Sequence, residues 1–257
     1  MPVLPLAAWL DSYQTELRAA LDRAAEQQFR FVQANAARDE LDPRRWPPSA
    51  RRHLRRYLRD RGLVLQGLTL QFPGAGLADP READSRVARL RATLELCADL
   101  GVRRAGVTLS GRADPATADL ARELLGVVAA EADRVSVLTT VIDPGSPHDL
   151  PSAVRAAGAP LLRAGLDTAT RPGGGVSPDD LAAAGDVFLR DGRPRPHGFE
   201  ETEFGAGEVD FGRWLADLTT AAPDAGLVLR HDTPGRVDAL RAGRVYMESL
   251  LGWSPRP

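Results

Sequence analysis

The chain contains no lysine, because all 33 of its basic residues are arginine. A lysine amine can lose its proton and attack a carbonyl carbon, whereas an arginine guanidinium effectively never loses its proton. The sequence therefore excludes aldolases that form an imine with their substrate through a lysine.

Cysteine is almost absent as well, since Cys97 is the only one, and an internal disulfide is therefore impossible. Cys97 falls inside an expected helix, where the simplest interpretation is a small buried apolar side chain. The net charge of −2 gives no general attraction to nucleic acid or to an anionic membrane.

Long apolar runs are missing too. The longest, such as residues 62–70, are far shorter than the roughly 20 residues that span a bilayer. The chain also does not begin with the charged and apolar segments of a signal peptide. We therefore expect a cytoplasmic protein that does not enter a membrane.

The chain is long enough and apolar enough for one large core. It has 257 residues, of which 43% are hydrophobic, and α/β barrels routinely use about 250 residues as one domain. We therefore expect residues 1–257 to form a single domain.

Apolar segments of strand length alternate with segments of helical periodicity along the chain. Helices are expected where apolar side chains recur at helical spacing, as at Leu90 and Leu94 in a helix that ends at Gly101. Two later helices are expected to start at Asp114-Pro115 and Thr233-Pro234, because proline suits the first position of a helix. Asp210 is placed to cap the helix that follows it by accepting from free backbone N–H groups of the first turn. The expected strands are 3–9, 29–34, 63–70, 105–109, 135–141, 161–166, 186–189 and 227–229.

This alternation predicts a (β/α)8 TIM barrel. A doubly wound open sheet is the alternative, but no G-x-G-x-x-G motif follows the first strand. In a barrel, the site forms where the strands end. Many polar residues at these ends suit sugar hydroxyls, and the candidates are Gln33, Gln71, Thr108, Thr140, Asp167, Asp191, Arg230 and His231.

Residues 185–231 carry a more specific pattern. The strand at 186–189 is followed by Asp191-Gly192 and a long polar loop, the motif G-x-G-E-V-D-F comes next at residues 205–211, and a helix leads to a closing strand. This pattern resembles the seventh and eighth units of the xylose-isomerase-like TIM barrels, the sugar phosphate isomerase/epimerase superfamily. The resemblance implies a barrel that acts on, or binds, a small sugar-like molecule.

The resemblance also implies a metal site, which this chain lacks in large part. Most metal-dependent members hold a divalent cation with a Glu after strand five, an Asp after strand six, a His on strand seven and a Glu after strand eight. Asp167 matches the aspartate. The other positions carry Thr139 or Thr140, Phe188 and Arg230. A single carboxylate cannot hold Mg²⁺ or Mn²⁺, so we expect neither a metal nor another cofactor.

Two classes of function remain open. The first is an isomerase or epimerase that works without a metal, with Asp167 or a loop glutamate such as Glu203 as base and Arg230 stabilising an enolate-like oxyanion. The second is a relative without catalytic activity that binds a sugar-like or anionic ligand, or serves as an assembly subunit. If Arg230 faces the pocket, we expect it to pair with Asp167 when no ligand is bound. The alternative is that Arg230 points outward between helices and reaches solvent. The sequence favours no particular oligomeric state.

Three further features each allow two interpretations. His231 directly follows the last strand and either faces the pocket or lies solvated in a loop. Glu200, Glu201 and Glu203 either bring a carboxylate over the barrel mouth or form an exposed acidic loop. The arginine-rich run at residues 44–61 has an apolar inner face, so we expect a solvated helix rather than a nucleic-acid surface.

Overall fold

The computed structural model describes residues 5–112, 114–171, 176–195 and 198–252. Within these residues, eight parallel strands close a barrel, and β1 pairs with both β2 and the last strand, β10. The predicted (β/α)8 barrel is therefore confirmed, and the open-sheet alternative is wrong. The barrel strands are β1 (Leu6–Trp9), β2 (Phe31–Asn35), β3 (Val64–Leu70), β4 (Arg104–Thr108), β5 (Leu138–Ile142), β6 (Leu162–Asp167), β7 (Ala184–Leu189) and β10 (Gly226–Leu229).

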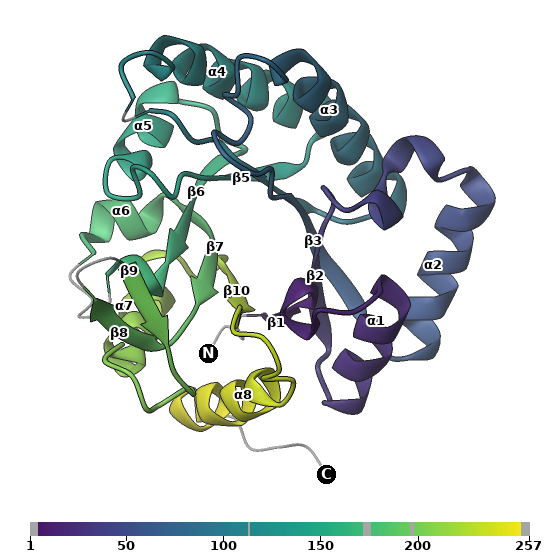
Figure 1. The fold of residues 1–257 in the computed structure, drawn as a ribbon, viewed down its shortest axis with the longest axis vertical. Coiled ribbons are helices and arrows are strands. Elements are labelled where there is room, and N and C mark those ends of the chain that lie inside the picture. The colour runs from purple at the N-terminus through teal and green to yellow at the C-terminus, as the bar shows by residue number, and fades with distance from the viewer. Residues whose placement is uncertain (1–4, 113, 172–175, 196–197, 253–257) are drawn as a thin grey trace.

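Helices form a ring outside the barrel (Figure 1). They follow the strands in alternation, as the sequence predicts. Their bounds are α1 (Leu17–Glu26), α2 (Pro48–Asp60), α3 (Ala83–Leu100), α4 (Ala118–Val135), α5 (Leu150–Ala157), α6 (Pro178–Ala182), α7 (Phe211–Ala221) and α8 (Ala239–Leu250). Among the described residues, none of these helices is both long and apolar enough to cross a membrane.

Several helix ends behave as the sequence predicts. The Asp210 carboxylate accepts from the Arg213 N–H at 3.0 Å and so caps α7. Helix α3 ends at Gly101, which adopts the left-handed conformation that glycine favours. Cys97 is buried in α3, as expected. Two starts differ: α4 begins at Ala118 rather than at Asp114, and α8 begins at Ala239 rather than near Thr233.

The segment after β7 was expected to be a polar loop, but it contains an antiparallel hairpin. Its strands are β8 (Gly192–Arg195) and β9 (Gly198–Glu201), and Gly192 pairs with Glu201. This pairing returns Glu201 to the carboxyl end of β7. Charged residues in both strands and a proline in β8 hide the pattern from the sequence, because the hairpin buries little apolar surface.

The barrel interior has an apolar layer above a polar one. Trp9, Phe188 and Val228 pack together with Ile142 inside the barrel, apart from the larger core between strands and helices. Asp186 lies two residues before Phe188 on the same face of β7, and therefore one layer deeper. The apolar layer is consequently the floor of the barrel mouth.

Gln33 and Thr140 belong to the deeper polar layer rather than to the mouth. Both are fully buried, and the Gln33 amide donates to Thr69 Oγ1 at 2.7 Å and to Asp186 Oδ2 at 3.3 Å. The structure therefore places both side chains below the floor of the mouth rather than at its surface. The sequence pattern ended both strands one residue too early, since β2 runs to Asn35 and β5 runs to Ile142.

Candidate functional site

Two arginines stand over the apolar floor at the mouth of the barrel. Arg190 follows Phe188, and Arg230 follows Val228, by two residues, so both share the inward face of their strands. The Arg230 guanidinium carbon lies 5.8 Å from the centroid of the Trp9 ring and 6.0 Å from that of the Phe188 ring. Contact with aromatic faces favours the charged guanidinium and limits its orientation.

Carboxylates surround Arg190. Its Nη1 lies 3.3 Å from Asp167 Oδ2, its Nε donates to Glu201 Oε1 at 2.8 Å, and its Nη2 lies 3.6 Å from Asp232 Oδ2. Arg190 is therefore the centre of the ion network at the mouth.

The expected pair between Arg230 and Asp167 is wrong. Within the described residues, Asp167 pairs with Arg190, and Arg230 pairs with Asp232. The reason is the strand order β10-β7-β6, which places Arg190, directly after β7, between the ends of the other two strands. The Arg230 Nε lies 2.9 Å from both oxygens of Asp232, and its Nη2 lies 2.8 Å from Oδ2.

The hairpin supplies the carboxylate that lies over the mouth, and that carboxylate is Glu201 rather than Glu203. Only 5% of the Glu201 side chain is exposed, and its Oε2 accepts from the N–H groups of Asp232 at 2.8 Å and Thr233 at 2.9 Å. Glu203 is exposed and pairs with Arg236 at 3.0 Å. The choice between these glutamates depends on the hairpin register, which the sequence pattern did not reveal.

The surroundings shift the pKa values of these groups in different directions. Burial raises the pKa of Asp167 above its ordinary value, although the charge of Arg190 acts to lower it. Burial acts to raise the pKa of Asp232 also, but the hydrogen bonds and charge of Arg230 outweigh it and lower the pKa. Burial acts to lower the pKa of Arg190, and the charges of Asp167 and Glu201 outweigh it. A carboxyl group with a raised pKa suits proton transfer near neutral pH.

Of the two interpretations of His231, the solvated loop histidine is wrong. It is only 4% exposed, its backbone N–H donates to Ser12 Oγ at 3.0 Å, and its Nδ1 lies 3.7 Å from Glu201 Oε2. It therefore lies beneath the hairpin, beside the ion network.

The buried side chain of Asp191 forms hydrogen bonds with the backbone of the protein itself. It is 2% exposed, and its carboxylate accepts from the backbone of the loop that follows the hairpin: from Gly205 at 2.6 Å, Gly207 at 3.2 Å and Val209 at 3.4 Å. It also accepts from the neighbouring Gly192 N–H at 2.8 Å. Asp191 thus organises the loop rather than facing a ligand.

The two remaining candidates lie on the opposite side of the barrel. Gln71 follows β3 and is half-buried, and its backbone N–H donates to Asn35 Oδ1 at 3.2 Å. Thr108 ends β4 and is nearly buried, and its carbonyl accepts from the Leu77 N–H at 2.8 Å. The structure does not bring either residue into contact with the arginine network.

The residues at the mouth do not fit the divalent cation of the metal-dependent barrels. The inward-facing residue at the end of β5 is Ile142, since Thr140 lies one layer deeper and Thr139 faces outward. Phe188 and Arg230 occupy the corresponding places on β7 and β10. Within the described part of the chain, no three His, Cys, Asp or Glu side chains are grouped as metal ligands.

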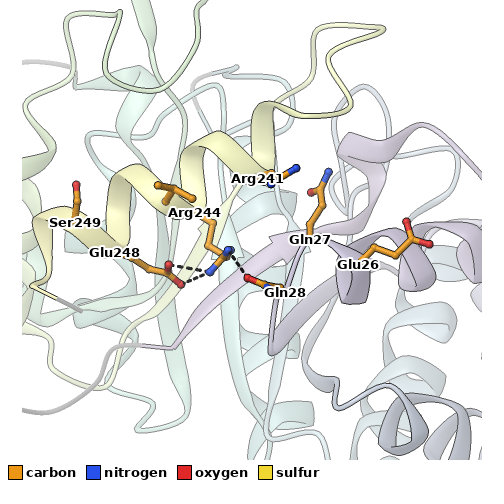
Figure 2. Close-up of a pocket in the computed structure, with 8 residues that line it drawn as sticks. Glu26, Gln27, Gln28, Arg241, Arg244, Glu248 and Ser249 are labelled. Atoms are coloured by element: carbon orange, nitrogen blue, oxygen red, sulfur yellow. Dashed lines mark hydrogen bonds and ion pairs between the residues drawn. The ribbon is translucent and has the colours of Figure 1, made fainter. Parts of the chain in front are cut away.

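A separate groove of about 470 Å³ lies between the end of α1 and helix α8 (Figure 2). Arg244 Nη1 lies 2.7 Å from Glu248 Oε1 within α8, and Arg244 Nη2 donates to Gln28 Oε1, just beyond α1, at 3.2 Å. Gln27 is also engaged, since it bonds Tyr13 and the Val237 carbonyl. The groove includes no strand end of the barrel, so we assign it to helix packing.

Comparison with known proteins supports the fold. Neither a family model nor a curated protein matches the chain. A solved xylose isomerase domain protein from Planctomyces limnophilus shares 16% identity over 97% of each chain, with a TM-score of 0.79. A xylose isomerase-like TIM barrel protein from Mycobacterium smegmatis, in complex with magnesium, shares 13% identity over 97% of each chain, also with a TM-score of 0.79.

A xylose isomerase domain protein from Alicyclobacillus acidocaldarius shares 24% identity, covering 97% of this chain and 98% of its own, with a TM-score of 0.74. The chain therefore has the fold of the xylose isomerase-like TIM barrels, as residues 185–231 indicated. At sequence identities this low, the similarity shows the fold alone, and neither a ligand nor an activity can be inferred from these structures.

Proposed function

We propose that this chain binds a small sugar-like anion at the mouth of the barrel, and that it isomerises or epimerises this ligand without a divalent metal. The observation that carries the proposal is the Arg230 guanidinium, oriented over Trp9 and Phe188 and close to the raised-pKa carboxyl of Asp167. In the sequence comparison, Arg230 stands where the metal-dependent barrels have a metal-binding glutamate.

The proposed chemistry needs a base and a group that stabilises negative charge. Asp167 takes a proton from the carbon beside a carbonyl group, and the electron pair of that C–H bond forms a carbon–carbon double bond as the carbonyl oxygen becomes negative. Arg230 donates hydrogen bonds to this oxygen. For an isomerisation, the hydroxyl group on the deprotonated carbon gives its proton to the former carbonyl oxygen, and the carbon-bound proton returns to the neighbouring carbon, so that the carbonyl group has moved by one carbon. For an epimerisation, the proton returns to the same carbon from the other face and the carbonyl group forms again where it was.

A relative that only binds its ligand is the second candidate. The observation that favours it is the mutual pairing of Arg190, Arg230, Asp167 and Asp232, which leaves the charges compensated without any substrate. Such pairing is costly to rearrange during catalysis.

Binding and proton transfer are tested separately. Thermal shift with sugar acids and sugar phosphates measures binding, and proton NMR in D2O measures the exchange of carbon-bound hydrogen for deuterium. We expect Arg230→Met to lose the thermal shift, and Asp167→Asn to keep binding but lose exchange. Arg236→Met is the matched control, because Arg236 is an exposed arginine paired with Glu203.

Each outcome decides between the candidates. Exchange that persists after dialysis against EDTA supports the metal-independent enzyme. Binding without exchange supports the second candidate. Stabilisation of wild type by none of these anions, or equal stabilisation of Arg230→Met, would remove Arg230 as the binding group and refute both.

A further inference from the structure

The Asp232 carboxylate lies on Arg230 as a bound carboxylate would. The Arg230 Nε is 2.9 Å from both Asp232 oxygens, and the Nη2 is 2.8 Å from Oδ2. The same Oδ2 lies 3.6 Å from Arg190 Nη2. Two guanidinium groups therefore face one carboxylate position at the mouth of the barrel, and planar forks of this kind match a carboxylate in geometry.

The backbone of Asp232 is fixed, whereas its side chain reaches solvent. Its N–H donates to Glu201 Oε2 at 2.8 Å, and its carbonyl accepts from Gln14 Nε2 at 3.2 Å. The side chain is 37% exposed. Rotation about the Cα–Cβ bond can therefore turn this carboxylate into water and uncover both arginines without moving the chain.

We propose that Asp232 is an internal competitor that occupies the carboxylate subsite of the ligand, and that this ligand is a sugar acid. The proposal rests on the proposed function, because it uses Arg230 as the binding group. On binding, the carboxylate of the sugar acid replaces that of Asp232 on Arg230, and Asp232 turns outward. Asp232 thereby sets both the affinity and the preference for a carboxylate.

The charge at the mouth selects a carboxylate over a phosphate. Asp167 and Glu201 both pair with Arg190, next to the position that Asp232 occupies. Exchange of one carboxylate for another leaves the charge beside Arg230 and Arg190 unchanged. A phosphate ester carries close to two negative charges at neutral pH and adds repulsion from these neighbouring carboxylates.

The test measures the Kd of three probes by calorimetry: D-glucuronate, its uncharged methyl ester and glucose 6-phosphate. Wild type is compared with Asp232→Asn and Asp232→Ala, both of which remove the competing charge. Asp238→Asn is the matched control, since Asp238 precedes α8 and its side chain makes no capping hydrogen bond. Circular dichroism establishes that each variant is folded.

We expect both Asp232 variants to bind D-glucuronate about tenfold more tightly than wild type, which corresponds to about 1.4 kcal/mol. The methyl ester should show no such gain, glucose 6-phosphate should bind wild type more weakly than D-glucuronate, and Asp238→Asn should behave as wild type.

The failure of this inference differs from the failure of the proposed function. If wild type binds D-glucuronate, Arg230→Met does not, and the Asp232 variants bind no more tightly than wild type, then Asp232 does not compete and only the inference falls. If neither wild type nor the folded Asp232 variants bind any of the anions, both the inference and the proposed function are wrong.

Discussion

The loop between the hairpin and α7 depends on one buried carboxylate, and replacing Asp191 by alanine tests this dependence. In wild type, the Asp191 carboxylate accepts from the backbone N–H groups of Gly192, Gly205, Gly207 and Val209. The fit is close, because a Cβ added at Gly207 would lie 2.0 Å from Asp191 Oδ1. The substitution removes every one of these acceptor contacts at once.

The magnitude follows from which N–H groups can find water instead. Gly205 is exposed and Gly207 half-buried, so both can be rehydrated, whereas Gly192 and Val209 are buried. A buried donor left without a partner costs about 1–3 kcal/mol. Because the Val209 contact is long, we expect a total loss of about 3 kcal/mol. For a chain of this size, that loss corresponds to a decrease in Tm of about 6–12 °C.

The assay is urea unfolding combined with hydrogen exchange of the amides in residues 203–209. Glu203→Ala is a control in the same loop, and loss of its exposed ion pair with Arg236 should cost less than about 1 kcal/mol. Exchange in the loop should accelerate in Asp191→Ala and not in the control. A loss of stability for Asp191→Ala no larger than that of the control would refute the structural role of Asp191.

Two further predictions concern the buried charges. Arg190→Met leaves the carboxylates of Asp167 and Glu201 without their arginine partner. The free energy of unfolding, measured in urea, should therefore decrease by about 3–5 kcal/mol. A decrease smaller than that of Glu203→Ala would contradict the central place of Arg190 in the network. Burial raises the pKa of Asp186 against the opposing charge of Arg104, so the folded state holds this proton more tightly than the unfolded state does. Its contribution to stability therefore falls as pH rises from the unfolded pKa of about 3.9 through the raised folded value, and Asp186→Asn should flatten this part of a pH–stability profile. A profile of the same slope in Asp186→Asn would contradict it.

Local sequence patterns predicted the elements of the barrel better than their ends. Strand and helix periodicity identified the parallel strands and the helices between them, and the Asp210 cap formed as expected. The starts of α4 and α8 were placed several residues too early. Proline at residues 115 and 234 suggested a helix start, but the following residues form turns before each helix begins.

The sequence by itself determined the order of strands and helices and placed Asp167 and Arg230 at strand ends, because these depend on short-range periodicity and on alternation of side chains along a strand. Only the tertiary structure decided the pairing of charges. Arg190 pairs with Asp167 because β7 lies between β6 and β10. Glu201 reaches the mouth because the hairpin pairs it with Gly192. Strand order and hairpin register join residues far apart in the chain, and the local pattern around each residue does not specify such contacts.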